Sequence, residues 1–313
     1  MALEYARALL LTIVFMTVNF MAGALLFGFA NEVIRNPAWT EQWTKLIMAP
    51  PFLWGAGAAL VLVWLWAPGL SASKRWLGLD HRRPLPENTA PRDFFRAPEA
   101  WVALLLLLPP SVQILGAELE TLSRLAFPYP AFYASLQELL SPKGSAVDLI
   151  GAFATLALIG PICEELLFRG MILGGFLKIA GDRTPNSNQA ASTRPGVNLF
   201  WPVLFQAFLF ALVHLNPWQF AYALPMGYLF GWLRVRSGSL WPCIVLHCGN
   251  NLLAIILVYF APPIQFLNSG IYSSIEHVPV PLLLLAGVLC ALAIFLLERR
   301  ARIITRPSEV PAA

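Results

Sequence analysis

The fold is decided by the segment Pro161-Ile162-Cys163-Glu164-Glu165-Leu166-Leu167-Phe168-Arg169-Gly170, which carries three charged side chains. The surrounding run from Val147 to Ala180 is almost entirely apolar, and its other charges lie near its two ends. A charge at the centre of a bilayer costs about 3 kcal/mol or more unless it is paired or hydrated. Two adjacent carboxylates and an arginine in one such run therefore need partners from elsewhere in the chain.

The composition is that of a polytopic membrane protein. Of the 313 residues, 58% are hydrophobic and 12% are charged, whereas about 25% are charged in an ordinary soluble domain. The net charge of +4 comes with no basic cluster interleaved with aromatic residues, so it does not indicate nucleic-acid binding. The four cysteines lie in apolar runs without CxxC spacing, which predicts small buried side chains rather than disulfides.

Eight apolar runs predict membrane helices. They cover residues 8–30, 47–68, 100–117, 147–180, 199–215, 217–234, 239–261 and 279–297. The polar segments 71–98 and 181–196 are expected to be loops, the first of them cytoplasmic. Residues 118–144, with several aromatic side chains, are expected to form an interfacial or a re-entrant segment.

The distribution of lysine and arginine decides whether the run 147–180 is one span or two. With one span, most of the 21 basic residues lie on the side of both termini. With a turn at Gly160-Pro161, the excess of Lys and Arg would be much smaller and would lie on the opposite side of the membrane. Because cytoplasmic segments carry the excess of Lys and Arg, we expect one span and two cytoplasmic termini. No organelle-targeting signal is visible, so the expected location is a bacterial inner membrane.

The expected fold is therefore all-α, with about eight transmembrane helices and a site buried in the helix bundle. Residues 1–146 are expected to contain three spans and a cytoplasmic loop. Residues 147–261 are expected to form the catalytic core. Residues 262–313 are expected to supply the last span and a basic cytoplasmic tail.

Helical spacing separates the two adjacent glutamates. Glu165 and Arg169 are four residues apart, so their side chains lie on one face of a helix and are expected to pair. Glu164 points about 100° away from Glu165. It is thus expected to be free for chemistry, whereas the competing interpretation is an ion pair beside a protonated or snorkelling glutamate.

Three further polar side chains of the predicted spans are candidate partners for Glu164. His214 lies near the end of the fifth run, and His247 and Asn251 lie four residues apart in the seventh. At about 1.5 Å of rise per residue, all four side chains fall within a hydrocarbon layer of about 30 Å. A single histidine in a span is more often a packing residue, but this set is harder to explain as packing.

A carboxylate and two histidines suit the activation of water. The carboxylate can accept the proton of the water. The histidines can ligate a zinc ion that activates the same water, or His247 and Asn251 can donate hydrogen bonds to the oxyanion of a tetrahedral intermediate. Either version implies hydrolysis, of a peptide bond inside the membrane. The sequence has no HExxH motif, so the helix-borne zinc-protease pattern is absent.

These residues resemble the motifs of the CPBP intramembrane proteases, also called the CAAX prenyl protease and bacteriocin-processing (Abi) family. That family carries EExxxR, FxxxH and HxxxN or HxxxB, in this order and on separate spans. The matching positions here are Glu164-Glu165-xxx-Arg169, Phe210-xxx-His214 and His247-xxx-Asn251. The resemblance covers about residues 147–260, and the three motifs together are specific.

The resemblance implies a role for each matched residue. Glu164 would be the general base that activates water, and His214 would help to hold that water. His247 and Asn251 would form the oxyanion hole or ligate a metal. Glu165 and Arg169 would give structural support.

We therefore expect an intramembrane endopeptidase that acts on a membrane-anchored or lipidated protein or peptide tail, with the lipid bilayer as its environment. Two versions stay open: a zinc ion held by Glu164, His214 and His247, or a metal-free glutamate mechanism. The competing interpretation is a non-catalytic partner-binding protein, of the bacteriocin-immunity or scaffold type. A proton-coupled transporter with a Glu–His relay is a third, although no internal repeat is visible.

Overall fold

The computed structural model describes residues 2–35, 37–66, 97–128, 130, 141–182, 198–260 and 276–305. All regular secondary structure in these ranges is helical, which confirms the all-α prediction. The helices are α1 (Ala2–Ile34), α2 (Pro37–Ile47), α3 (Ala49–Trp66), α6 (Pro98–Trp101), η1 (Val102–Leu107), α7 (Leu108–Ala126), α9 (Ala146–Gly151), η2 (Ala152–Ile159), α10 (Gly160–Glu165), η3 (Leu166–Ile172), α11 (Leu173–Asp182), α12 (Phe200–Leu212), α13 (Pro217–Ser237), α14 (Trp241–Phe260) and α15 (Val280–Thr305); η1, η2 and η3 are π-helical.

Each of the eight predicted apolar runs contains a helix, and the chain is a polytopic membrane protein. Within the described residues, six helical stretches are long and apolar enough to cross a membrane: Ala2–Glu32, Thr40–Trp66, Pro98–Ala126, Ala146–Leu177, Trp241–Phe260 and Val280–Arg300. The other two runs are α12, which is apolar but has only 13 residues, and α13, which has 21 residues and ends with two arginines.

The long run around Glu164 is one uninterrupted helical segment. It continues from α9 through η2, α10 and η3 to α11, so Gly160-Pro161 makes no turn. Pro161 stands at the start of α10, directly after the π-helical segment η2. A local change to π-helix is one way in which a membrane helix accommodates the backbone groups that a proline frees. The expectation of one run rather than two is therefore correct.

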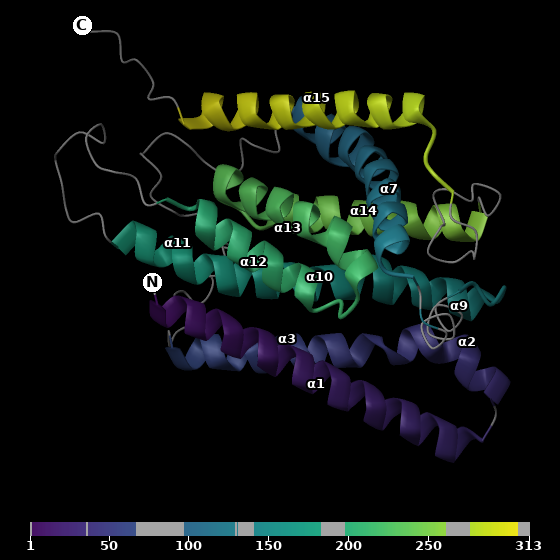
Figure 1. Cartoon of the computed structure of the whole chain (residues 1–313). Helices are drawn as coiled ribbons and strands as arrows, with labels where there is room; N and C mark the ends of the chain where they lie inside the picture. Colours follow the sequence, from purple (N-terminus) through teal and green to yellow (C-terminus); the bar gives the residue numbers. More distant parts are fainter. Residues whose placement is uncertain are drawn as a thin grey trace, which may run out of the picture.

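This segment lies at the centre of the bundle (Figure 1). The pair α1 and α3 packs on one side of it, and α12, α13 and α14 lie on the other. Most helices run along a common direction, whereas α7 crosses them at a steep angle and contacts α13, α14 and α15.

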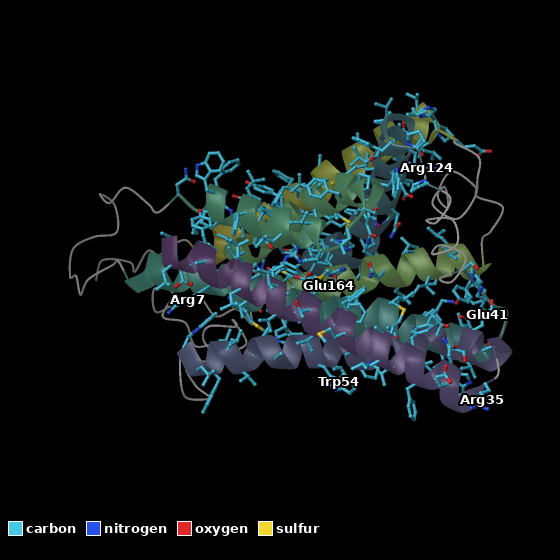
Figure 2. All side chains as sticks on the ribbon, turned by 60° about the horizontal axis from the view of Figure 1, so that its bottom comes forward. Arg7, Arg35, Glu41, Trp54, Arg124 and Glu164 are labelled. Carbon is cyan, nitrogen blue, oxygen red and sulfur yellow. The ribbon has the colours of Figure 1, made fainter. Side chains whose placement is uncertain are left out.

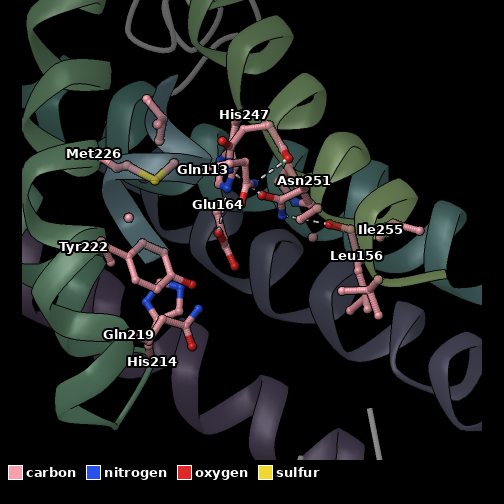
Figure 3. A pocket seen from close by; sticks show the side chains of 18 of the residues that line it. Gln113, Leu156, Glu164, His214, Gln219, Tyr222, Met226, His247, Asn251 and Ile255 are labelled. Carbon is pink, nitrogen blue, oxygen red and sulfur yellow. Dashed lines mark hydrogen bonds and ion pairs between the residues drawn. The ribbon is translucent and has the colours of Figure 1, made fainter. Parts of the chain in front are cut away.

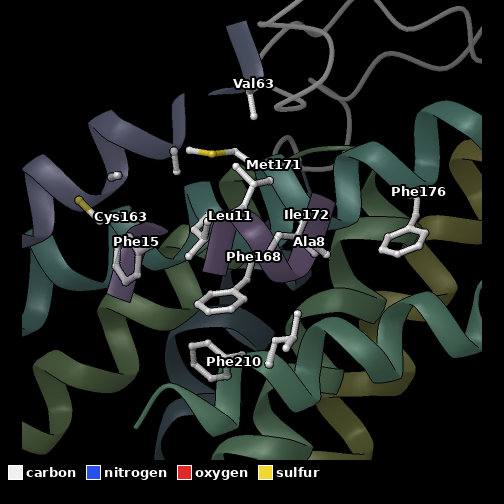
Figure 4. Close-up of a cluster of buried hydrophobic side chains, with 14 of the residues drawn as sticks. Ala8, Leu11, Phe15, Val63, Cys163, Phe168, Met171, Ile172, Phe176 and Phe210 are labelled. Atoms are coloured by element: carbon white, nitrogen blue, oxygen red, sulfur yellow. The ribbon is translucent and has the colours of Figure 1, made fainter. Parts of the chain in front are cut away.

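The largest buried cluster joins α1, α3, η3 and α12 (Figure 4). At its centre the rings of Phe168 and Phe210 meet edge to face, with centroids 5.4 Å apart. The outward faces of the bundle are apolar as well: Phe20 and Leu25 on α1, for example, are 75% and 71% exposed. Such surfaces are expected of helices that face lipid.

Polar contacts collect at the two ends of the bundle. The end at which α1 begins and α15 ends has Arg7 stacked over Trp66 and an ion pair of Arg236 with Glu298. We call it the terminal end. The opposite end has the ion pairs Lys143–Glu41 and Lys45–Asp148. In Figure 2, Arg7 and Arg35 mark the two ends, and Glu164 lies between them.

The largest error in a predicted boundary is at the end of the third run. The third run was expected to end at residue 117, but α7 continues to Ala126. Besides its polar residues, this extension contains Leu119, Leu122 and Leu125, which are exposed on the outer surface. The rest of the expected interfacial segment, like most of both expected loops, lies outside the described residues.

Candidate active site

The two adjacent glutamates occupy different environments. Both stand at the end of α10, between the π-helical segments η2 and η3. The Glu165 side chain is 0% exposed, whereas that of Glu164 is 16% exposed and lines a cavity. This follows from the rotation of about 100° between consecutive helical residues. Stretches of π-helix inside α-helices are frequent at functional sites.

Glu165 is held by the arginine that the sequence pairs with it. Its Oε1 accepts a hydrogen bond of 2.7 Å from Arg169 Nη1, and Arg169 Nη2 donates to the Gly227 carbonyl at 3.2 Å. The guanidinium also lies 4.2 Å from the ring centroid of Phe210 and 4.9 Å from that of Phe230. Ion pairing, hydrogen bonding and cation–π contact together offset the cost of burying these charges.

The same Glu165 oxygen contacts a histidine from another helix. His247 Nδ1, on α14, lies 2.8 Å from Glu165 Oε1. Since an ionised carboxylate only accepts hydrogen bonds, this partner places the ring proton of His247 on Nδ1. The other ring nitrogen, Nε2, then faces Glu164 Oε2 at 3.7 Å. That distance is too long for a direct hydrogen bond, but one water molecule can contact both atoms.

The second histidine is oriented in the same manner. His214 follows α12, and its Nδ1 lies 2.8 Å from the Phe210 carbonyl oxygen. A carbonyl only accepts hydrogen bonds, so the partner again places the proton on Nδ1. In their neutral forms both imidazoles therefore carry the lone pair on Nε2. A nitrogen in that state accepts a hydrogen bond from water and cannot donate one.

The four residues predicted to carry the chemistry line one cavity of about 430 Å³. They are Glu164, His214, His247 and Asn251, and Glu165 and Arg169 do not line it. In Figure 3, Glu164 lies between His247 on one side and His214 on the other. The volume is within the range of ligand pockets, roughly 300–1,000 Å³.

An amide cluster borders the cavity on α14. Asn251 Nδ2 donates to the Leu156 carbonyl at 2.9 Å, which ties α14 to η2 and leaves one amide hydrogen. Asn250 Nδ2 donates weakly to Asn251 Oδ1 at 3.5 Å. Two buried polar atoms of the cavity wall, Asn250 Oδ1 and Thr155 Oγ1, have no hydrogen-bond partner in the described part of the chain. Such atoms are rare in folded proteins, and both belong to residues that line the cavity.

Sequence reasoning missed the contribution of α7. Gln113 Nε2 donates to the Asn250 backbone carbonyl at 2.9 Å, and Gln113 and Glu120 both line the cavity. Gln219 and Tyr222 of α13 line it as well. The available signal was Gln113 itself, an amide inside an otherwise apolar run. The contact of His247 with Glu165 was missed because it depends on the relative depth of two separate helices.

The candidate zinc ligands do not form a metal-binding group. Glu164, His214 and His247 share the cavity. However, the described residues contain no group of three or more His, Cys, Asp or Glu side chains placed to hold a metal ion. A metalloprotease is therefore not supported by this arrangement.

Comparison with known families agrees with the motifs. Residues 146–253, about a third of the chain, match the family model described as "Type II CAAX prenyl endopeptidase Rce1-like". This match confirms the family resemblance drawn from the three motifs. No curated protein and no solved structure matches the chain.

Proposed function

We propose that this chain, whose residues 146–253 match the CAAX prenyl endopeptidase model, is an intramembrane endopeptidase in which Glu164 activates the attacking water. The observation that carries the proposal is the convergence on one cavity of Glu164 from α10, His214 from the segment after α12, and His247 and Asn251 from α14. A peptide bond is the substrate because the family cleaves such bonds. The cavity lies beside helices that are apolar enough to cross a membrane.

In the proposed mechanism, a water molecule donates one hydrogen bond to the Glu164 carboxylate and its other hydrogen bond to the Nε2 lone pair of one of the two histidines. Glu164 takes one proton from this water as the oxygen attacks the scissile carbonyl carbon. The remaining amide hydrogen of Asn251 stabilises the oxyanion that forms. Glu164 then gives its proton to the leaving nitrogen as the C–N bond breaks, which yields a carboxylic acid and an amine.

Glu165 does not contact the reacting atoms and acts through His247. Its Oε1 lies between the Arg169 guanidinium and the His247 imidazole, so it fixes the ring orientation and the position of the ring proton. If His247 becomes an imidazolium during the reaction, this carboxylate stabilises the charge, and Nε2 then becomes a second donor for the oxyanion. The family-based role of Glu165 as structural support is thus extended to one of positioning.

The expected substrate is a membrane-anchored or lipidated protein or peptide tail, and the expected location is a bacterial inner membrane with both termini in the cytoplasm. Support for this orientation comes from the terminal end of the bundle, which carries Arg7, Arg234, Arg236, Arg299 and Arg300. Basic residues mark the cytoplasmic side.

A non-catalytic partner-binding protein is the alternative, and one experiment separates it from the protease. The full chain is purified in detergent, incubated with a lipidated peptide, and the products are identified by mass spectrometry. We expect cleavage by the wild type and by Glu41→Gln, whose side chain is 52% exposed at the opposite end. We expect none by Glu164→Gln. Full activity of Glu164→Gln would exclude the mechanism.

A further inference from the structure

We infer that the cavity opens at the end of the bundle opposite both termini, so that the protease receives its substrate from the non-cytoplasmic side. The substrate would be an extended peptide segment that reaches the cavity from the outer half of the bilayer or from beyond it. The cleavage step and the orientation of the bundle in the membrane rest on the proposed function, whereas the end of the bundle at which the cavity opens does not.

On α14, on α13 and on the central helix, the residues that line the cavity lie towards the end that is farther from the terminal end. On α14 they begin at His247 and continue to Tyr259, near the opposite end. On α13, which runs the other way, they lie between Gln219 and Met226, in its first half. The central helix contributes no lining residue after Glu164. The cavity therefore occupies only the half of the bundle that is remote from the termini.

Towards the terminal end the bundle is closed by buried side chains. Directly past Glu164, Phe168 and Arg169 are 0% exposed. Phe230 and Leu233 on α13 and Cys243 on α14 are fully buried at the same side of the site. Phe168 and Phe230 lie against the Arg169 guanidinium, and within the described ranges no residue past Glu164 on the central helix lines the cavity.

The short α12 explains why the cavity reaches the opposite end. With 13 residues, α12 is about 20 Å long, less than the hydrocarbon thickness of about 30 Å. Figure 1 shows that the hairpin of α12 and α13 ends well before α9 and α14 do. With the first residue of α12 at the membrane surface, its tip, residues 213–216, lies inside the layer, and His214 is part of it.

The tip has a backbone that needs a polar environment. Leu215 has a left-handed φ of 56° and is 76% exposed. Asn216 Oδ1 caps α13 through Gln219 N at 2.6 Å, and its Nδ2 donates to the His214 carbonyl at 3.2 Å. Irregular backbone at membrane depth is tolerated where it is buried or where it borders a water-filled cavity. Polar lining residues between this tip and the opposite end, such as Glu120 and Tyr259, provide that hydrated path.

The orientation of the bundle in the membrane determines which class of substrate can enter the cavity. In the proposed orientation the terminal end faces the cytoplasm, so the opening faces away from the cytoplasm. A tail that stays in the cytoplasm cannot enter from that side. A peptide segment exposed on the non-cytoplasmic face, held near the membrane by a lipid or an apolar anchor, can enter and reach Glu164.

Cysteine accessibility tests the proposal. The four native cysteines are replaced by alanine in the full chain, and single cysteines are introduced as Gln219→Cys in the cavity, Arg35→Cys at the opposite end and Arg236→Cys at the terminal end. Intact bacterial cells are treated with a membrane-impermeant maleimide. We expect Gln219→Cys and Arg35→Cys to be labelled, and Arg236→Cys to be labelled only after permeabilisation.

Two results would overturn the inference: labelling of Gln219→Cys only after permeabilisation, or no labelling from either side while the two markers behave as expected. The experiment is repeated in a Glu164→Ala background, where the same labelling is expected because access needs no catalysis. A lipidated peptide is then added to right-side-out and inside-out vesicles. Cleavage only in right-side-out vesicles supports the inference. Cleavage only in inside-out vesicles contradicts it. If the three cysteine variants are labelled as expected but neither vesicle preparation cleaves the peptide, the inferred side of access is supported and the proposed function is rejected.

Discussion

His247 Nδ1 and Arg169 Nη1 both contact the same oxygen, Oε1 of Glu165, at 2.8 and 2.7 Å. The Glu165 carboxylate thus joins a buried cation within its own helical run to a histidine that lines the cavity. The more buried of the two glutamates therefore orients the site, and the more exposed one faces the substrate space.

The first prediction compares the two glutamates. Glu165→Ala leaves Arg169 as an unpaired buried charge, so we expect it to lower the free energy of unfolding by about 3–5 kcal/mol. Glu164→Ala removes a partly exposed carboxylate that has no such partner, and we expect a change near zero. Both are measured by denaturant unfolding in detergent. Equal stability of the two variants would contradict the assigned environments.

The second prediction separates the two nitrogens of His247. Asparagine places its amide nitrogen near the position of Nδ1, whereas glutamine places it near that of Nε2. We expect His247→Asn to keep most of the stability, because the hydrogen bond to Glu165 remains, and to lose activity. We expect His247→Gln to lose both stability and activity. If the glutamine variant were the more stable one, the ring proton of His247 would be wrongly placed.

The third prediction concerns Gln113, which lies outside the matched family region. Gln113→Leu removes the hydrogen bond to the Asn250 carbonyl, worth about 0.5–1.5 kcal/mol. A loss of that size in transition-state binding lowers kcat/KM by up to about tenfold. The matched control on the same helix is Ser123→Ala, whose hydroxyl contacts Pro217 O away from the cavity. Equal kcat/KM for Gln113→Leu and Ser123→Ala would show that Gln113 of α7 does not contribute to the site.

The fourth prediction tests the ion pair at the opposite end. Lys45 and Asp148 are 1% and 0% exposed, and Asp148 also accepts a hydrogen bond from Tyr259. Lys45→Met should lower the free energy of unfolding by about 3–5 kcal/mol, because it leaves a buried carboxylate unpaired.

Its control is Glu41→Gln, which removes the exposed partner of Lys143 and should cost at most about 1 kcal/mol. The double variant Lys45→Met with Asp148→Leu should recover much of the loss, since it removes both charges. Additive losses in the double variant would show that the pair is not coupled.

Much of the fold could be predicted from the sequence, because apolar runs report membrane helices directly. The charge distribution also distinguished one helical run from two at Gly160-Pro161. The end of α7 could not be predicted in the same way. There the polar and apolar residues alternate by helix face, so a window that averages hydropathy ends the helix too early.

The site was predictable in part. The separation of Glu164 from Glu165 follows from the helical rotation, and the pairing of Glu165 with Arg169 follows from their spacing. The contact of Glu165 with His247 and the position of Gln113 depend on how α14 and α7 cross the central helix. Crossing angles arise from side-chain packing between helices, which no motif in one segment records.

The most direct test of the central claim, that Glu164 activates the attacking water, is the single-turnover cleavage rate of Glu164→Gln. Purified wild type and Glu164→Gln, matched for unfolding midpoint in the same detergent, are mixed in excess with a lipidated peptide. The account predicts a rate constant at least about a hundredfold lower for the variant, the usual minimum contribution of a general base. An unchanged rate constant in a variant that is equally stable would contradict it.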